Sequence, residues 1–396
     1  MRGAALLLLA ALASGCAAPP GPSITPPAAA DLQEGLLLER AAKYDNTELA
    51  DLLTRVTTAL LLDAESTPPD IVVLRDPSIN AFVLPSGRVY LHTGLLARLE
   101  NEAQLATILG RALSLATRRE ELERAAAQGR TDAALLAIPS TIGATLADAT
   151  TETGVLSPVA AVILGSHLGT VHVAAVTGYG RSLEHAADVE AVRRLVRAGY
   201  DPKEAPKTFE RLRRGAKAGG ALEGFFLGND AALAERAERM ARLVAGEYAV
   251  AAAAPDTIST TAHFEEVVAA TARDNARLEL RSGRFRAAQE QIDRALAVWP
   301  TDPHAYLALG ELLRLRAQRA RGAADRDELA RRAFAAYQRS ASLEPGAAEV
   351  VRELGLLYYQ QGQHERAREA FMRYITLSPE APDVPRVHEY IAILTR

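Results

Sequence analysis

The chain has 396 residues and a formal net charge of −4, from 45 lysines and arginines against 49 aspartates and glutamates. This length predicts about two to three domains, each large enough to bury a core. The chain lacks the basic surplus that phosphate binding needs, so nucleic acid is not an expected partner. Its hydrophobic residues reach 48% but its aromatics only 5%, which predicts alanine- and leucine-rich helical packing. With one cysteine, a metal site would have to use histidines and carboxylates.

The amino terminus predicts export. An apolar run over residues 4–13 follows Arg2 and is too short to span a bilayer with both ends anchored, so residues 1–15 are expected to be a signal peptide. The residues before Cys16 resemble a bacterial lipobox, which implies cleavage before Cys16 and lipidation of its thiol. The alternative is an ordinary cleaved signal with an incidental cysteine. Ala17 occupies the position where an aspartate would resemble an inner-membrane retention signal, so we expect the outer membrane, with residues 16–31 as a proline-rich tether.

The next part of the chain predicts helices around a small sheet. Apolar spacing is helical over residues 32–62, with Asn46 and Thr47 as a break or cap. The elements expected after it are strands at 71–74, 81–84 and 89–91, a hairpin turn at 85–87, and helices at 95–99, 102–116 and 182–198. The segment 133–176 is rich in alanine, glycine and threonine, and we expect a buried or surface-lying helix pair there, with a membrane span as the alternative.

The carboxyl-terminal part resembles tetratricopeptide repeats over residues 274–379. Two units carry the pattern, and a third, weaker unit precedes them and departs from the consensus at Asn275 and Ala276. The matching positions are Tyr306, Leu309, Gly310, Ala333, Tyr337 and Pro345 in one unit, and Leu354, Gly355, Tyr358, Ala367, Phe371 and Pro379 in the next. An insertion around residues 316–327 lengthens the first of these two units. The alternative is a generic array of helical hairpins, and either array exposes a groove that binds peptides.

The middle of the chain resembles the zinc metallopeptidase family of the CaaX prenyl endopeptidases and BepA-type periplasmic proteases, peptidase family M48. The resemblance covers about residues 40–240. Its first part runs from Asp76 through an Asn-Ala-Phe strand, a hairpin and a Gly-Leu-Leu helix to Ala106. Its second part is residues 178–202, with Glu184 and Asp188 at the positions of a third metal ligand and its partner. The fold implied is mainly α with a small β-sheet, followed by an α-α superhelical repeat array.

The departures fall on the chemistry. In H-E-x-x-H, two histidines hold zinc and the glutamate takes a proton from the metal-bound water. The resemblance places Arg111, Ala112 and Leu115 at these three positions, and Glu184 alone cannot hold zinc tightly. We therefore expect no zinc or other cofactor and no peptidase activity. The alternative is an active metalloendopeptidase with an unorthodox site, which would need zinc.

No histidine is expected to rescue the site. Those in the middle of the chain match no ligand position, and His185 should point off the face of Glu184; the others there are His92, His167 and His172. In the repeats, His304, His364 and His388 show no ligand spacing and are expected at the surface.

Two features of the degenerate domain suggest what remains. Arg111 is expected within reach of Glu184, so that an ion pair links the two helices in place of the metal; the alternative is that Arg111 turns to solvent. In the family, the strand corresponding to residues 80–84 accepts substrate by strand addition, which needs no zinc. The alternative for Asn80, Ala81, Phe82, Val83 and Leu84 is core packing with a turn at Asn80, and the two can hold together.

These expectations combine into one hypothesis. The chain is expected to be an outer-membrane lipoprotein on the periplasmic face, with a metallopeptidase-like domain over residues 32–250 and a repeat domain over residues 265–396. We expect it to bind envelope proteins or unfolded segments through the edge strand and the repeat groove, as a chaperone in assembly or quality control, by analogy with the BepA type. The alternatives are the unorthodox peptidase and a repeat scaffold without chaperone activity.

Overall fold

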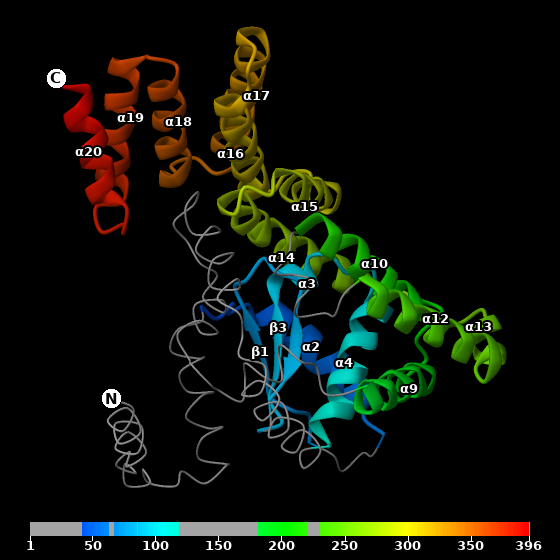
Figure 1. Ribbon diagram of the computed structural model, residues 1–396. Coiled ribbons are helices and arrows are strands. Elements are labelled where there is room, and N and C mark those ends of the chain that lie inside the picture. Colours follow the sequence, from blue (N-terminus) through cyan, green and yellow to red (C-terminus); the bar gives the residue numbers. More distant parts are fainter. Residues whose placement is uncertain (1–41, 63–66, 85, 119–180, 220–229, 396) are drawn as a thin grey trace, which may run out of the picture.

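The computed structural model describes residues 42–62, 67–84, 86–118, 181–219 and 230–395. Helices dominate, with one small sheet near the amino-terminal side, as the sequence predicts (Figure 1). In these ranges no helix is both long enough and apolar enough to cross a membrane. Cys16, the tether and the segment 133–176 lie outside the described residues, and what the sequence predicts for them stays a prediction.

The sheet has three strands in the order β1-β3-β2. Strand β3 (Val89–His92) is central and pairs in parallel with β1 (Ile71–Leu74) and antiparallel with β2 (Ala81–Val83). The predicted hairpin between β2 and β3 is confirmed. Gly87 in its turn has φ of 86°, a left-handed conformation that glycine adopts without steric cost.

The described part of the first module, the chain before residue 262, contains seven helices: α2 (Thr47–Leu60), α3 (Thr93–Leu96), α4 (Glu102–Ala116), α9 (Arg181–Arg197), α10 (Glu204–Gly219), α12 (Asp230–Gly246) and α13 (Ala249–Ala253). Asn46 caps α2, as expected, since its side chain accepts a hydrogen bond from the Leu49 amide. The helix expected at 95–99 instead begins at Thr93 and ends at Leu96. Glycine is needed at position 94, because a Cβ there would lie 2.1 Å from the Pro77 carbonyl oxygen.

Helix α4 occupies the centre of this module and is buried over almost its whole length. Figure 1 shows α2 and α4 near the sheet, with α9, α10 and α12 beyond α4. At its first residue, the buried Glu102 carboxylate accepts hydrogen bonds from Arg55 at 2.8 and 2.9 Å, from Tyr200 at 2.7 Å, and from Thr261. Burial alone would raise the pKa of Glu102, but these donors hold it below its ordinary value. One carboxylate therefore joins four segments of the chain.

The repeat region comprises α14 (Ala262–Arg281), α15 (Phe285–Val298), α16 (Pro303–Arg319), α17 (Ala323–Leu343), α18 (Ala348–Gln360), α19 (His364–Leu377) and α20 (Val384–Leu394). In the second and third pairs the helices approach closely where the repeat pattern places glycine. A Cβ on Gly310 would lie 2.3 Å from the ring of Tyr337, and one on Gly355 would lie 2.7 Å from the ring of Phe371. The insertion at 316–327 extends α16 and α17 past the length of the next pair.

Helix α14 belongs to both modules. Phe264, Val267 and Val268 in its first half join the core that contains the sheet and α4, whereas Ala276 and Leu280 in its second half pack in the core of the first repeat. Figure 1 shows α14 between the sheet and the remaining repeats. The two modules thus share one continuous helix.

Polar contacts at this junction are buried as well. The Thr93 hydroxyl donates to Asn275 at 2.8 Å, and Arg98 forms an ion pair with Glu279 at 2.9 Å. Asn275 and Glu279 are fully buried. At this departure from the repeat consensus, the Asn275 side chain contacts both modules, since it accepts from Thr93 and donates to Gln291 on α15 at 3.0 Å.

Ion pairs also run along the first helices of the three repeats. Arg277 on α14 pairs with Glu311 on α16 at 2.9 Å, and Arg314 on α16 pairs with Glu353 on α18 at 2.8 Å. Burial, together with the charge of Glu353, raises the pKa of Glu311 to about 7 despite the contact with Arg277.

Candidate functional site

Helices α4 and α9 pack directly against each other. In the family that the sequence resembles, the corresponding helices carry the zinc site. Gly110 makes the direct packing possible, since a Cβ there would lie 3.2 Å from the Cα of Ala191 on α9. The close approach brings Arg111 of α4 beside Glu184 and Asp188 of α9. The sequence predicts Arg111 within reach of Glu184, and the structure contains that ion pair.

Arg111 holds both carboxylates at once. Its guanidinium forms an ion pair with Glu184 and donates from Nε to Asp188 Oδ1 at 2.7 Å. The side chains are largely withdrawn from water, with Arg111 12% exposed and Asp188 3% exposed. A charge-assisted contact of this kind is strong because little water competes for it.

Two further arginines from α12 complete the cluster, and neither was predicted. Arg236 donates to Asp188 Oδ1 at 2.7 Å and lies 3.1 Å from Glu184, and Arg239 lies 3.5 Å from Asp188. Arg236 also lies over the ring of Phe209 on α10, 4.4 Å from its centroid. In the sequence, both arginines belong to a run of alternating charges that is typical of a solvated helix face, so no local signal distinguished them.

The electrostatics of the cluster favour the charged form of Asp188. Burial alone would raise the pKa of Asp188, but the guanidinium groups of Arg111 and Arg236 outweigh burial and hold its pKa below the ordinary value. Burial and the neighbouring Arg111 lower the pKa of Arg236. The cluster is therefore a network of ion pairs in which three guanidinium groups surround two carboxylates.

These residues do not fit a zinc ion. The oxygens of Glu184 and Asp188 already accept from guanidinium groups, and a divalent cation there would be repelled by three arginines. At the other two family positions, Ala112 and Leu115 are buried and carry no ligand atom. Across the described ranges no three histidine, cysteine, aspartate or glutamate side chains are grouped closely enough to hold a metal.

The predicted peptide-binding strand lies at an edge of the described sheet, where β2 pairs with β3 alone. Its side chains are core residues too, since Phe82, Val83 and Leu84 are buried and the Phe82 ring stacks on Tyr90 at 5.0 Å. Asn80, just before β2, is also buried. Strand β2 therefore packs into the core and also lies at an edge of the sheet. Addition of a peptide strand to it stays a prediction.

Five of the histidines named from the sequence lie within the described residues. His92 is fully buried, with Nδ1 2.8 Å from the Ser78 hydroxyl, and His185 is exposed on α9. In the repeats, His304, His364 and His388 are exposed.

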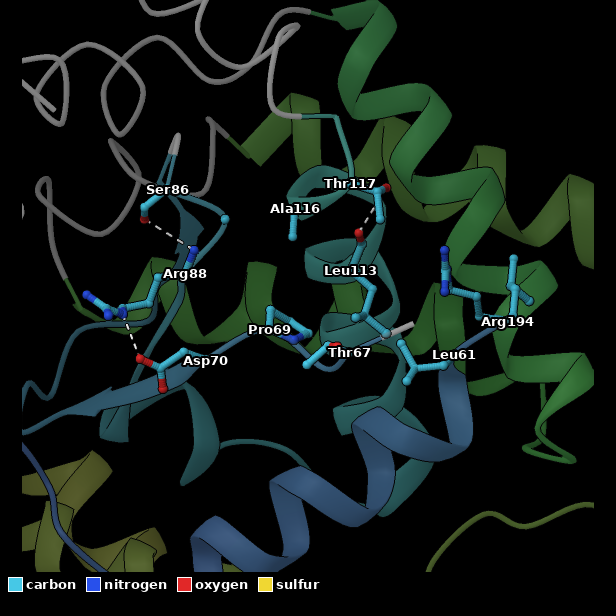
Figure 2. A pocket seen from close by; sticks show the side chains of 12 residues that line it. Leu61, Thr67, Pro69, Asp70, Ser86, Arg88, Leu113, Ala116, Thr117 and Arg194 are labelled. Atoms are coloured by element: carbon cyan, nitrogen blue, oxygen red, sulfur yellow. Dashed lines mark hydrogen bonds and ion pairs between the residues drawn. The ribbon is translucent and has the colours of Figure 1, made fainter. Parts of the chain in front are cut away.

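A separate pocket of about 370 Å³ lies on the other face of α4, lined by Leu113 and Ala116 (Figure 2). Its rim carries an ion pair between Arg88 and Asp70 at 2.7 Å, and Arg194 lies on the opposite wall. Its described lining contains no histidine or cysteine. The pocket thus combines apolar walls with polar and charged side chains at its rim.

Comparison with known families agrees with this geometry. The profile of peptidase family M48 matches residues 43–263, and two tetratricopeptide repeat profiles match residues 273–330 and 320–392. Both resemblances seen in the sequence are thereby confirmed.

Several curated relatives match part of the chain, three of them as follows. The chain is 32% identical over 151 residues to a Vibrio cholerae protein named "Putative beta-barrel assembly-enhancing protease", which is 37% of this chain and 28% of that protein. It is 28% identical over 146 residues to the beta-barrel assembly-enhancing protease of Escherichia coli K12, 37% of this chain and 28% of that protein. It is 26% identical over 174 residues to the mitochondrial metalloendopeptidase OMA1 of Arabidopsis thaliana, 44% of this chain and 31% of that protein. The matches thus span less than a third of each relative.

Among solved structures, the human IFIT1 dimer with PPP-AAAA aligns with 91% of this chain and 79% of its own at 15% identity. The TM-score of 0.27 is too low to support an argument about fold or function.

Proposed function

The chain belongs to peptidase family M48, and we propose that in this member an arginine cluster has replaced the zinc site, so that the domain binds polypeptides without cleaving them. The observation that carries the proposal is the position of Arg111, whose guanidinium occupies both carboxylates that remain from the family's metal site. The base that would activate water is missing as well, since Ala112 stands at its position. Binding and catalysis are separable here, because the sheet and the repeats do not depend on zinc.

The proposed setting is the bacterial envelope. Two of the matched relatives are named for beta-barrel assembly, and each is matched over less than a third of its length, so their role reaches this chain only as a proposal. We propose that the chain is lipidated at Cys16 and held on the periplasmic face of the outer membrane by the tether 16–31. The repeats, which in other proteins bind peptide segments, would then act with the M48 domain on envelope proteins during assembly or quality control.

The domain limits belong to the same proposal. We assign residues 32–250 to the metallopeptidase-like domain and 265–396 to the repeats, with β2 as a strand to which an extended client segment can add.

Metal content and client binding test the proposal together. The chain without residues 1–16 and a Glu184→Ala variant would be purified without affinity metals and analysed for zinc by mass spectrometry. We expect a folded protein without stoichiometric zinc in both. Stoichiometric zinc that is lost in the variant would contradict the proposal and favour an active metalloendopeptidase with an unorthodox site.

Client binding uses a urea-unfolded outer-membrane β-barrel protein diluted into buffer. We expect the chain to suppress its aggregation and to leave it uncleaved on denaturing gels. Aggregation that proceeds as in the presence of serum albumin would refute the chaperone function and favour a scaffold, whereas fragments of the client would refute the loss of peptidase activity.

A further inference from the structure

A cleft of about 560 Å³ opens where the first repeat meets the M48 domain. Its walls come from the start of α2, the first half of α14, and the turn between α15 and α16, elements that Figure 1 shows at the junction. Clefts between modules are common ligand sites because two surfaces contribute side chains to them. The residues of the arginine cluster and of strand β2 do not line this cleft.

Trp299 gives this cleft an exposed aromatic wall. It is the one tryptophan of the chain and is 43% exposed, and it is the one aromatic residue among the strongly exposed large hydrophobic side chains of the described residues. Burying a large aromatic ring stabilises a fold, and the rings of Tyr337 and Phe371 are fully buried. The exposed indole of Trp299 gives up this stabilisation. An exposed aromatic ring within a cleft is typical of a binding surface.

The charge of the cleft is negative and incompletely balanced. Three carboxylates line it, from Glu48, Glu266 and Asp302, beside the guanidinium of Arg273 and the imidazole of His263. Arg273 is already matched, since it pairs with Asp302 at 2.9 Å and with the adjacent Asp274 at 2.8 Å. In the part of the chain that the structure describes, Glu48 and Glu266 form no ion pair.

We propose that this cleft binds the side chain of a lysine or arginine in an extended polypeptide, with the cation against the face of Trp299 and beside Glu48 and Glu266. A cation over an indole ring is attracted by the negative face of the ring, and the two carboxylates add to that attraction. Ala270, partly exposed at the cleft, supplies an apolar surface for the methylene stem of such a side chain. The inference rests on the proposed function, because it names the chemistry of the client that the domain pair holds.

A polypeptide fits better than a free amine because of where the cleft lies. Helix α14 is the first helix of the repeat array and is followed along the array by α16 and α18, which contact each other in turn. A chain held by one basic side chain at the junction can therefore continue along the repeats, which adds contacts that a small amine cannot make.

Trp299 itself reports on the cleft, since no other tryptophan contributes to the fluorescence of the chain. A short unstructured peptide with several lysines and no tryptophan would be titrated into the chain without residues 1–16, alongside the same peptide with its lysines acetylated. We expect a change of tryptophan emission with the lysine peptide, affinity about tenfold weaker for the acetylated peptide, and weaker binding at high salt. Equal affinity for both peptides, or no change of emission with either, overturns the inference.

A matched pair of variants separates the cleft from net charge. Glu48→Gln combined with Glu266→Gln should weaken binding of the lysine peptide about tenfold. Glu369→Gln combined with Glu389→Gln, on exposed positions of α19 and α20, changes the net charge equally and should leave affinity unchanged. An equal loss in both variants shows a general charge effect and overturns the inference.

The failures can be told apart from those of the proposed function. If the chain does not suppress aggregation of the unfolded β-barrel protein at all, the proposed function fails. If it does, and the Glu48→Gln, Glu266→Gln variant suppresses aggregation and binds the lysine peptide as well as the unchanged chain, only the assignment of the cleft fails.

Discussion

Replacing Arg111 by alanine tests whether an ion pair now links α4 to α9. The substitution leaves Asp188, which is 3% exposed, and Glu184, which is 21% exposed, without one of their cations. Removing one partner of a fully buried pair costs about 3–5 kcal/mol. Here Arg236 still contacts both carboxylates and Glu184 keeps some water, so we expect a loss of about 2 kcal/mol in the free energy of unfolding.

The assay is calorimetry together with urea unfolding. For a unit of the size matched by the M48 profile, a loss of about 2 kcal/mol lowers Tm by about 4–8 °C. Arg193→Ala on α9 is the matched control, since its side chain is 56% exposed and pairs with Glu190 at 3.0 Å, and its expected cost is under about 1 kcal/mol. Equal stability of the two variants would refute the link.

A double substitution distinguishes a linking pair from two independent contacts. Arg111→Met combined with Glu184→Leu replaces both charges by apolar side chains of similar length. Because no unpaired charge is left between these two positions, we expect the double variant to lose less stability than the sum of the two single variants, by about 1 kcal/mol or more. Strict additivity would show that the two side chains do not interact.

Three further predictions concern other parts of the fold. Glu102→Gln should lower the free energy of unfolding by about 2–3 kcal/mol in urea, because three donors lose a buried carboxylate, whereas the half-exposed Glu100→Gln should cost under about 1 kcal/mol. Gly310→Ala should cost about 1–3 kcal/mol by its collision with Tyr337, and Gly246→Ala, which meets nothing within 4 Å, should be neutral or stabilising in the same thermal scan. The pKa of Glu311 is raised from 4.5 to about 7, so the folded chain holds a proton that the unfolded chain has lost, and stability should fall by up to about 3 kcal/mol as pH rises through that window; a Glu311→Gln variant with the same pH dependence of Tm would contradict this.

The sequence predicts well whatever depends on local patterns. Asn46 caps its helix because its side chain reaches an amide three residues on, and the glycines of the repeats are needed because a ring from the partner helix fills their space. The contact between Arg111 and Glu184 was also predictable, since the family resemblance places the two helices side by side.

The rest depends on contacts between distant segments. Arg236 reaches Asp188 across 48 positions, and nothing in the spacing of charges on its own helix reveals that one arginine turns inward. The junction is similar, because Asn275 accepts from Thr93, 182 positions away. Periodicity shows that a helix has two faces, but it does not show which distant segment covers them. The tryptophan cleft was missed for the same reason, since Trp299 and Glu48 meet only in the folded chain.

The shared helix α14 determines how the two modules act together. Modules joined by a small polar interface are expected to move relative to one another. Here separation would expose Phe264, Val267 and Val268, which are fully or almost fully buried, and would leave Asn275 and Glu279 without their partners in the M48 domain. Losing both the apolar burial and the buried polar contacts is costly, so the first repeat is part of the same rigid body as the sheet. Bending of the array is therefore expected after the first repeat rather than between the first repeat and the sheet.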